Sequence, residues 1–74
     1  MLDQKIILEY AIKGIDAQID ELEKSISKGR KLIKEDESKL YDLQPIINIK
    51  KDEIEKLLKH QGELKWQLAE LEEK

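Results

Sequence analysis

The sequence predicts an all-α protein, an antiparallel helical hairpin (a two-helix coiled coil) that self-associates into a helical bundle. Its 74 residues include eleven Leu, eleven Glu and thirteen Lys but no Val, Thr, Phe or Cys. Straight-chain residues of this kind favour helices, whereas strands draw on β-branched and aromatic residues. Apolar residues also recur in alternating steps of three and four, which is the helical period. The only proline, Pro45, divides this pattern into two segments.

The first helix is expected over about residues 2–43. Its apolar residues follow a heptad pattern, abcdefg, in which a and d face the partner helix. The a positions are Ile12, Ile19, Ile26, Ile33 and Leu40, and the d positions are Leu8, Ile15, Leu22 and Leu43. Gly29 and Asp36 interrupt the d positions. Pro45 has no backbone N–H and restrains the residue before it, so the helix should end there, with a turn at about 44–46.

The second helix is expected over about residues 47–73, which makes 1–74 a single helical-hairpin domain. Its a positions are Ile47, Ile54, Gln61 and Leu68, and its d positions are Lys50, Leu57, Leu64 and Leu71. A turn centred on Pro45 pairs residues whose numbers add up to 90, so that Gly29 faces Gln61. This register brings Glu23 near Lys65 and Glu37 near Lys51, and such opposite charges favour it.

Unequal helix lengths then leave about fifteen N-terminal residues without a partner helix. Apolar residues surround this segment on more than one face, so it needs more than one neighbour. A homodimer that forms a four-helix bundle supplies the missing contact. Trp66 points away from the hairpin seam, where an aromatic residue is typical of an interface. The expected protein interface comprises Leu2, Ile6, Ile7, Tyr10 and Trp66.

Neither catalysis nor a bound cofactor is expected. His60 is the only histidine and has no second ligand or nucleophile at a suitable spacing. The absence of cysteine excludes disulfides and thiolate metal sites, and no apolar run is long enough for a membrane span. We therefore expect a cytoplasmic protein that is not an enzyme and does not bind a membrane.

The function expected from these features is a protein-protein interaction module, such as an adaptor, assembly factor or small inhibitor, acting as a homo-oligomer and binding a further protein. Thirteen lysines against one arginine are typical of an AT-rich genome, which suits a phage or mobile-element regulator. The alternative is a small nucleic-acid-binding bundle, although the net charge of -3 disfavours it. Its basic face would comprise Lys24, Lys28, Arg30, Lys31 and Lys34.

Overall fold

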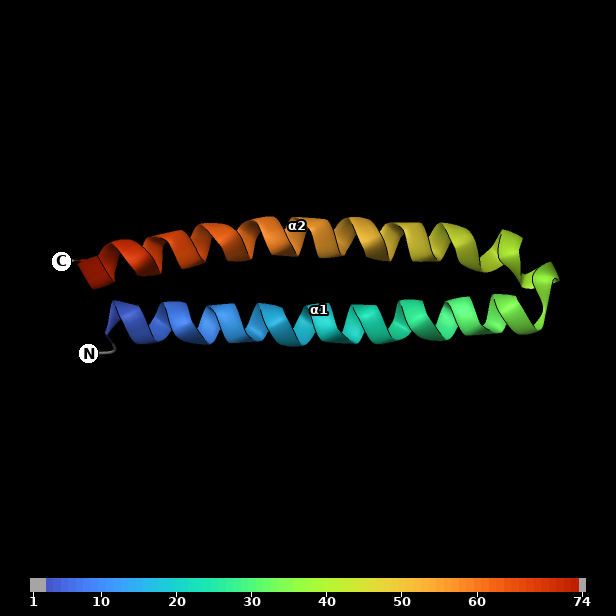
Figure 1. The fold of residues 1–74 in the computed structure, drawn as a ribbon, viewed down its shortest axis with the longest axis horizontal. Coiled ribbons are helices and arrows are strands. Elements are labelled where there is room, and N and C mark those ends of the chain that lie inside the picture. Colours follow the sequence, from blue (N-terminus) through green and yellow to red (C-terminus); the bar gives the residue numbers. More distant parts are fainter. Residues whose placement is uncertain (1–2, 74) are drawn as a thin grey trace.

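The computed structural model describes residues 3–73 and shows a hairpin of two long helices (Figure 1). Helix α1 spans Gln4–Glu35, a short 3-10 helix η1 spans Glu37–Lys39, and helix α2 spans Leu40–Glu73. The helices lie side by side over their whole length, so the start of α1 and the end of α2 lie at the same end of a molecule of 55 × 17 × 16 Å. The predicted antiparallel all-α hairpin is confirmed. Within residues 3–73, neither helix has an apolar stretch sufficient to cross a membrane.

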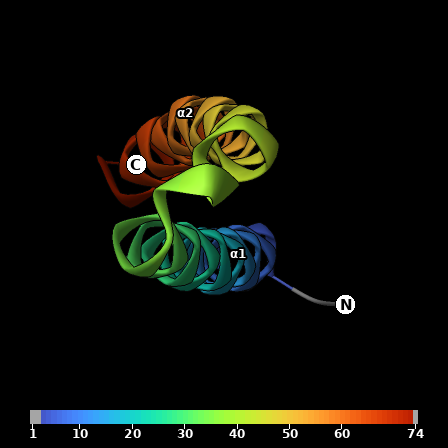
Figure 2. The ribbon, with the colours of Figure 1, turned by 90° about the vertical axis from the view of Figure 1, so that its right-hand side faces the viewer.

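The core is one seam between the two helices, and the end-on view shows no third layer (Figure 2). Every buried side chain among residues 3–73 occupies an a or d position of the predicted heptads. These are Leu8, Ile12, Ile15, Ile19, Ile26, Ile47 and Gln61. The half-buried apolar residues Leu22, Ile33, Ile54, Leu57 and Leu64 also occupy a and d positions. The heptad assignment therefore correctly predicts which face of each helix is buried.

The turn lies at residues 36–39, so the predicted turn at 44–46 and the helix ends at 43 and 47 are wrong. Asp36 leaves the helical conformation, with φ -146° and ψ 100°, after its N–H donates to the Leu32 carbonyl at 3.0 Å. Its carboxylate accepts hydrogen bonds from the Ser38 backbone N–H at 3.1 Å and from the Ser38 hydroxyl at 2.7 Å. This is an Asx turn, in which the carboxylate takes the place of a backbone carbonyl and caps the 3-10 helix that follows. Asp36 thus marks the turn, although its heptad position seemed only a polar interruption.

Pro45 lies inside α2, where the sequence analysis expected a helix end. A proline beyond the first turn removes one helical hydrogen bond and costs about 3 kcal/mol. Ending the first helix at Pro45 would instead have left Leu8, Ile12 and Ile15 without a partner helix, and each is now at least nine-tenths buried. Burial of three such side chains contributes about 4.5–9 kcal/mol. Packing therefore outweighs the local preference of the proline.

The pairing register differs from the predicted one by two heptads. Facing a and d residues have numbers that add up to 76 rather than 90, so Gly29 meets Ile47 and not Gln61. Asp16 bonded to Gln61 and Ser25 bonded to Lys50 agree with this register. The expected pairing of Glu23 with Lys65 and of Glu37 with Lys51 is therefore wrong. The predicted register fits the same heptads, because a shift by whole heptads still places each a position opposite a d position.

The predicted N-terminal overhang does not exist. Helix α1 has 32 residues and α2 has 34, and Leu8, Ile12 and Ile15 are buried within the hairpin of a single chain. An ion pair between Lys5 and Glu72 at 3.6 Å joins the two helices at this end. The predicted need of an unpaired N-terminal helix for a second molecule is therefore wrong, since Leu8, Ile12 and Ile15 are buried in one chain. Self-association would have to use other surfaces.

Three seam positions that lack a large apolar side chain, Gly29, Lys50 and Gln61, are each matched by a neighbour on the other helix. A glycine at position 29 leaves room for Ile47, because an added Cβ would lie 3.2 Å from the Ile47 Cδ1 atom. Lys50 donates a hydrogen bond to the Ser25 hydroxyl. Gln61, only 3% exposed, donates to the Ile12 carbonyl at 3.1 Å and to the Asp16 carboxylate. Isolated polar seam residues of this kind select one register at some cost in stability.

We expect Gln61→Leu to raise the free energy of unfolding by about 1 kcal/mol, because a buried leucine contributes more than the amide hydrogen bonds that it replaces. The Ile12 carbonyl keeps its helical hydrogen bond, and Asp16 is exposed to water. Urea denaturation followed by circular dichroism measures the change. Gln67→Leu, at an exposed position, serves as the control and should leave stability unchanged. A less stable Gln61→Leu variant would contradict this account of Gln61.

We expect Asp36→Ala to lower the melting temperature at neutral pH and to lose this effect in acid. The Ser38 hydroxyl and backbone N–H stabilise the carboxylate, which holds the pKa of Asp36 below its ordinary value. A depressed pKa stabilises the fold above about pH 4 and ceases to do so as the pH falls through the folded-state value. Thermal melts from neutral to strongly acidic pH measure this difference. Asp36→Asn keeps an acceptor oxygen that does not titrate, so its melting temperature should differ from that of Asp36→Ala by an amount that does not change with pH.

Candidate functional site

The residues that the sequence analysis assigned to a protein interface are exposed but do not form one patch. Ile6, Ile7, Tyr10 and Trp66 are 41%, 50%, 71% and 65% exposed, and Leu2 lies outside the described residues. Ile6 and Tyr10 line a shallow hollow on α1 together with Glu9 and Lys13. Trp66 lies on the other helix. The structure therefore provides two separate apolar spots near the chain ends.

Tyr10 and Trp66 point in opposite directions. Both occupy position f, which is the heptad position farthest from the seam, Tyr10 on α1 and Trp66 on α2. Around Trp66, residues Gly62 and Ala69 are exposed, and no atom lies within 4 Å of a Cβ built on Gly62. The indole ring thus stands beside two small residues on an open helix surface. One flat partner could not cover Tyr10 and Trp66 of the same hairpin together.

The basic residues of the alternative nucleic-acid face are all exposed, and four of the five lie on the outer side of α1. Lys28 lines a groove on one side of the hairpin with Ser25 and Leu32. Arg30 lines a hollow on the opposite side with Glu23 and Lys51. Lys24 forms an ion pair with Asp20 at 3.0 Å. By heptad position, Lys24, Lys28, Lys31 and Lys34 share the outer side of α1, at b, c and f, whereas Arg30 at e lies beside the seam next to Glu23.

A surface that the sequence analysis missed runs along one side of the seam. We call it the groove face, defined by Gln18, Ser25 and Leu32 of α1 and by Ile46 and Glu53 of α2. Residues seven apart lie above one another on a helix, so the members from each helix share one side. Two open grooves lie on this face, one near the middle of the hairpin and one nearer the turn.

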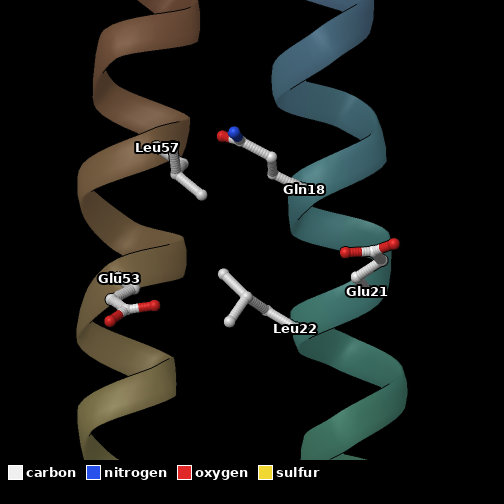
Figure 3. A pocket seen from close by; sticks show the side chains of 5 residues that line it. All are labelled: Gln18, Glu21, Leu22, Glu53 and Leu57. Carbon is white, nitrogen blue, oxygen red and sulfur yellow. The ribbon is translucent and has the colours of Figure 1, made fainter.

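The groove near the middle has about 520 Å³ of open volume and an apolar floor with acidic edges. Leu22 of α1 and Leu57 of α2 point into the space between the helices, with Gln18 across the gap from Leu57 (Figure 3). Glu21 on α1 and Glu53 on α2 stand at the edges. We call this groove the acidic half of the groove face.

The groove nearer the turn has the opposite charge. Leu32 and Ile46, which are 38% and 47% exposed, lie there with the half-buried Leu43. Lys28 on α1 and Lys50 on α2 line the same groove, whose volume is about 260 Å³. We call it the basic half of the groove face. One side of the hairpin thus carries two adjacent apolar grooves, one with carboxylates and one with ammonium groups.

The groove face could not be found in the predicted register, because facing numbers that add up to 90 place Lys50 level with Leu40 and far from Lys28. The sequence did contain two signals for the correct register. An Asp-x-Ser segment at Asp36 is typical of a turn. A glycine opposite a bulky residue, Gly29 with Ile47, is also better matched in size than a glycine opposite Gln61.

Within residues 3–73, no three His, Asp or Glu side chains gather closely enough to hold a metal ion. The His60 Nδ1 atom lies 4.0 Å from a Glu63 carboxylate oxygen on the same exposed helix face. This contact is an ordinary surface pair between residues three apart on a helix.

Comparisons with known proteins do not identify a family for this chain. No protein-family model matches it, and neither the curated proteins nor the solved structures contain a match. The candidate function therefore depends on the chain's own surfaces.

We expect Trp66, the only tryptophan, to fluoresce like tryptophan in water at high dilution, because its side chain is 65% exposed. Iodide should quench it nearly as efficiently as a free indole. If a partner covers this residue, the emission should shift to shorter wavelength as the ring leaves water. An emission spectrum typical of buried tryptophan at the lowest measurable concentration would contradict the exposed position.

Proposed function

We propose that this protein is a non-enzymatic coiled-coil module that acts through protein-protein contact and self-associates. The imbalance between buried and exposed apolar side chains supports the proposal. In the part of the chain that the structure describes, six hydrophobic side chains are buried, ten large ones are exposed, and no side chain is completely buried. A single layer of seam contacts is a small core for a chain of this size without disulfides. Association with a further helical surface would add the missing layer.

The exposed apolar residues favour binding to protein over binding to nucleic acid. They include Trp66, Tyr10 and Tyr41, and aromatic residues are enriched where interfaces concentrate their energy. Among the basic residues on α1, Lys24 is paired with Asp20 and Arg30 lies beside Glu23, and the chain as a whole carries a net charge of -3. We also propose that the protein acts in the cytoplasm, since a chain without cysteine carries no sign of an oxidising compartment.

Sedimentation equilibrium over a range of concentrations tests this proposal. We expect a mass above the 8.7 kDa of one chain at micromolar concentration. The melting temperature should also rise with concentration, because association stabilises the folded form by mass action. A species of 8.7 kDa at every concentration, with a constant melting temperature, would contradict self-association. Binding to another protein would then have to be tested by itself.

A further inference from the structure

We propose that the groove face binds the groove face of a second copy of this chain, with the two hairpins antiparallel, to form a four-helix bundle. This inference rests on the proposed self-association and names the surface that carries it. Each acidic half would lie on the basic half of the other copy. The charges, the apolar floors and the register of the hairpin all favour this arrangement.

A single two-fold axis pairs opposite charges of the two copies on α1 and also on α2. Placing Glu21 of one copy over Lys28 of the other puts the axis midway between these residues on α1. Placing Glu53 over Lys50 puts it midway between those residues on α2. The two midpoints correspond to residue numbers 24.5 on α1 and 51.5 on α2. These numbers add up to 76, as the numbers of facing residues do, so the two midpoints lie at the same height along the hairpin. Four attractive charge pairs then form about a single axis.

The same axis matches apolar residues. Ile46 of one copy meets Leu57 of the other, because both lie equally far from the axis on α2. Ile46 is 47% exposed and Leu57 is half-buried in the isolated hairpin. Association would therefore cover the floor of the acidic half with the edge of the basic half. Contacts of this kind supply the burial that the single seam of the hairpin lacks.

The charged groups are available for a partner. Within residues 3–73, none of the four side chains Glu21, Lys28, Lys50 and Glu53 forms an ion pair. Lys50 donates to the neutral Ser25 hydroxyl, although Glu53 is only three residues away. Complementary charges across an interface select the partner and its orientation more than they add affinity. An antiparallel second copy is the arrangement that this pattern selects.

The overlap is large enough for a specific interface. About 22 residues of each α1 overlap with the partner, which is a length of roughly 33 Å. With a hairpin width of 17 Å, about 560 Å² of each copy is covered, or about 1,100 Å² in total. Specific protein interfaces begin at about 1,000 Å². Tyr10 and Trp66 lie outside this overlap, so both remain exposed in the dimer.

Reversal of charge on each half tests the proposal. The variant Glu21→Lys/Glu53→Lys should dimerise at least about tenfold more weakly, since four attractive pairs become repulsive. The variant Lys28→Glu/Lys50→Glu should show a similar loss. An equimolar mixture of the two variants should recover dimerisation as a heterodimer, because all four pairs are attractive again. Sedimentation equilibrium and native mass spectrometry measure these species.

The control exchanges charges on the opposite side of the hairpin. Glu23→Lys/Lys51→Glu reverses two charges that line the other hollow, and dimerisation should not change. Circular dichroism confirms that each variant remains helical. Trp66 emission should stay unchanged as the wild type dimerises, since the ring lies outside the overlap. A concentration-dependent shift of this emission would instead place the interface at the chain ends and overturn the proposal.

The outcomes separate this inference from the proposed function. A wild type that associates, together with charge variants that associate equally well, would overturn the groove-face interface and leave self-association intact. A wild type that stays at 8.7 kDa would overturn both the groove-face interface and the proposed self-association. Recovery in the mixture but in neither variant alone would support the antiparallel arrangement, because reduced stability of a hairpin would not be corrected by mixing.

Discussion

The structure depends on one constraint: each helix can bury its apolar seam only against the other. A hairpin has only two helices and no third layer. Every a or d residue that extends beyond the end of the partner helix therefore stays in water. The lowest free energy therefore belongs to the register in which both helices have nearly equal length. The 32 residues of α1 and the 34 of α2 meet this condition.

This register requires two local features that are unfavourable by themselves. Pro45 lies within α2, where it removes one helical hydrogen bond. The turn has to form from charged residues, and Asp36 achieves it by accepting hydrogen bonds from Ser38. Neither feature is what a hairpin turn at a proline would show. Both are acceptable because the additional buried side chains contribute more than the proline costs.

The same constraint leaves most of the surface unpartnered and so leads to the proposed function. A two-helix seam covers only the a and d positions, and the remaining five positions of each heptad face water. On one side of the seam, half-buried seam residues together with the exposed Leu32 and Ile46 form two grooves, one flanked by carboxylates and the next by lysines. This segregation of charge distinguishes the groove face from the rest of the surface. It is also what an antiparallel contact between two identical copies requires.

The sequence by itself determined the helical class, the two antiparallel helices and the face of each helix that is buried, because the heptad period is a local property of the chain. It did not determine the register. Pairings two heptads apart satisfy the same a and d pattern, and only the total burial of residues such as Leu8 and Ile15, summed over both helices, separates them. The position of the turn and the assembly of the groove face from Glu21, Lys28, Lys50 and Glu53 follow from that register. They were therefore decided by the tertiary structure.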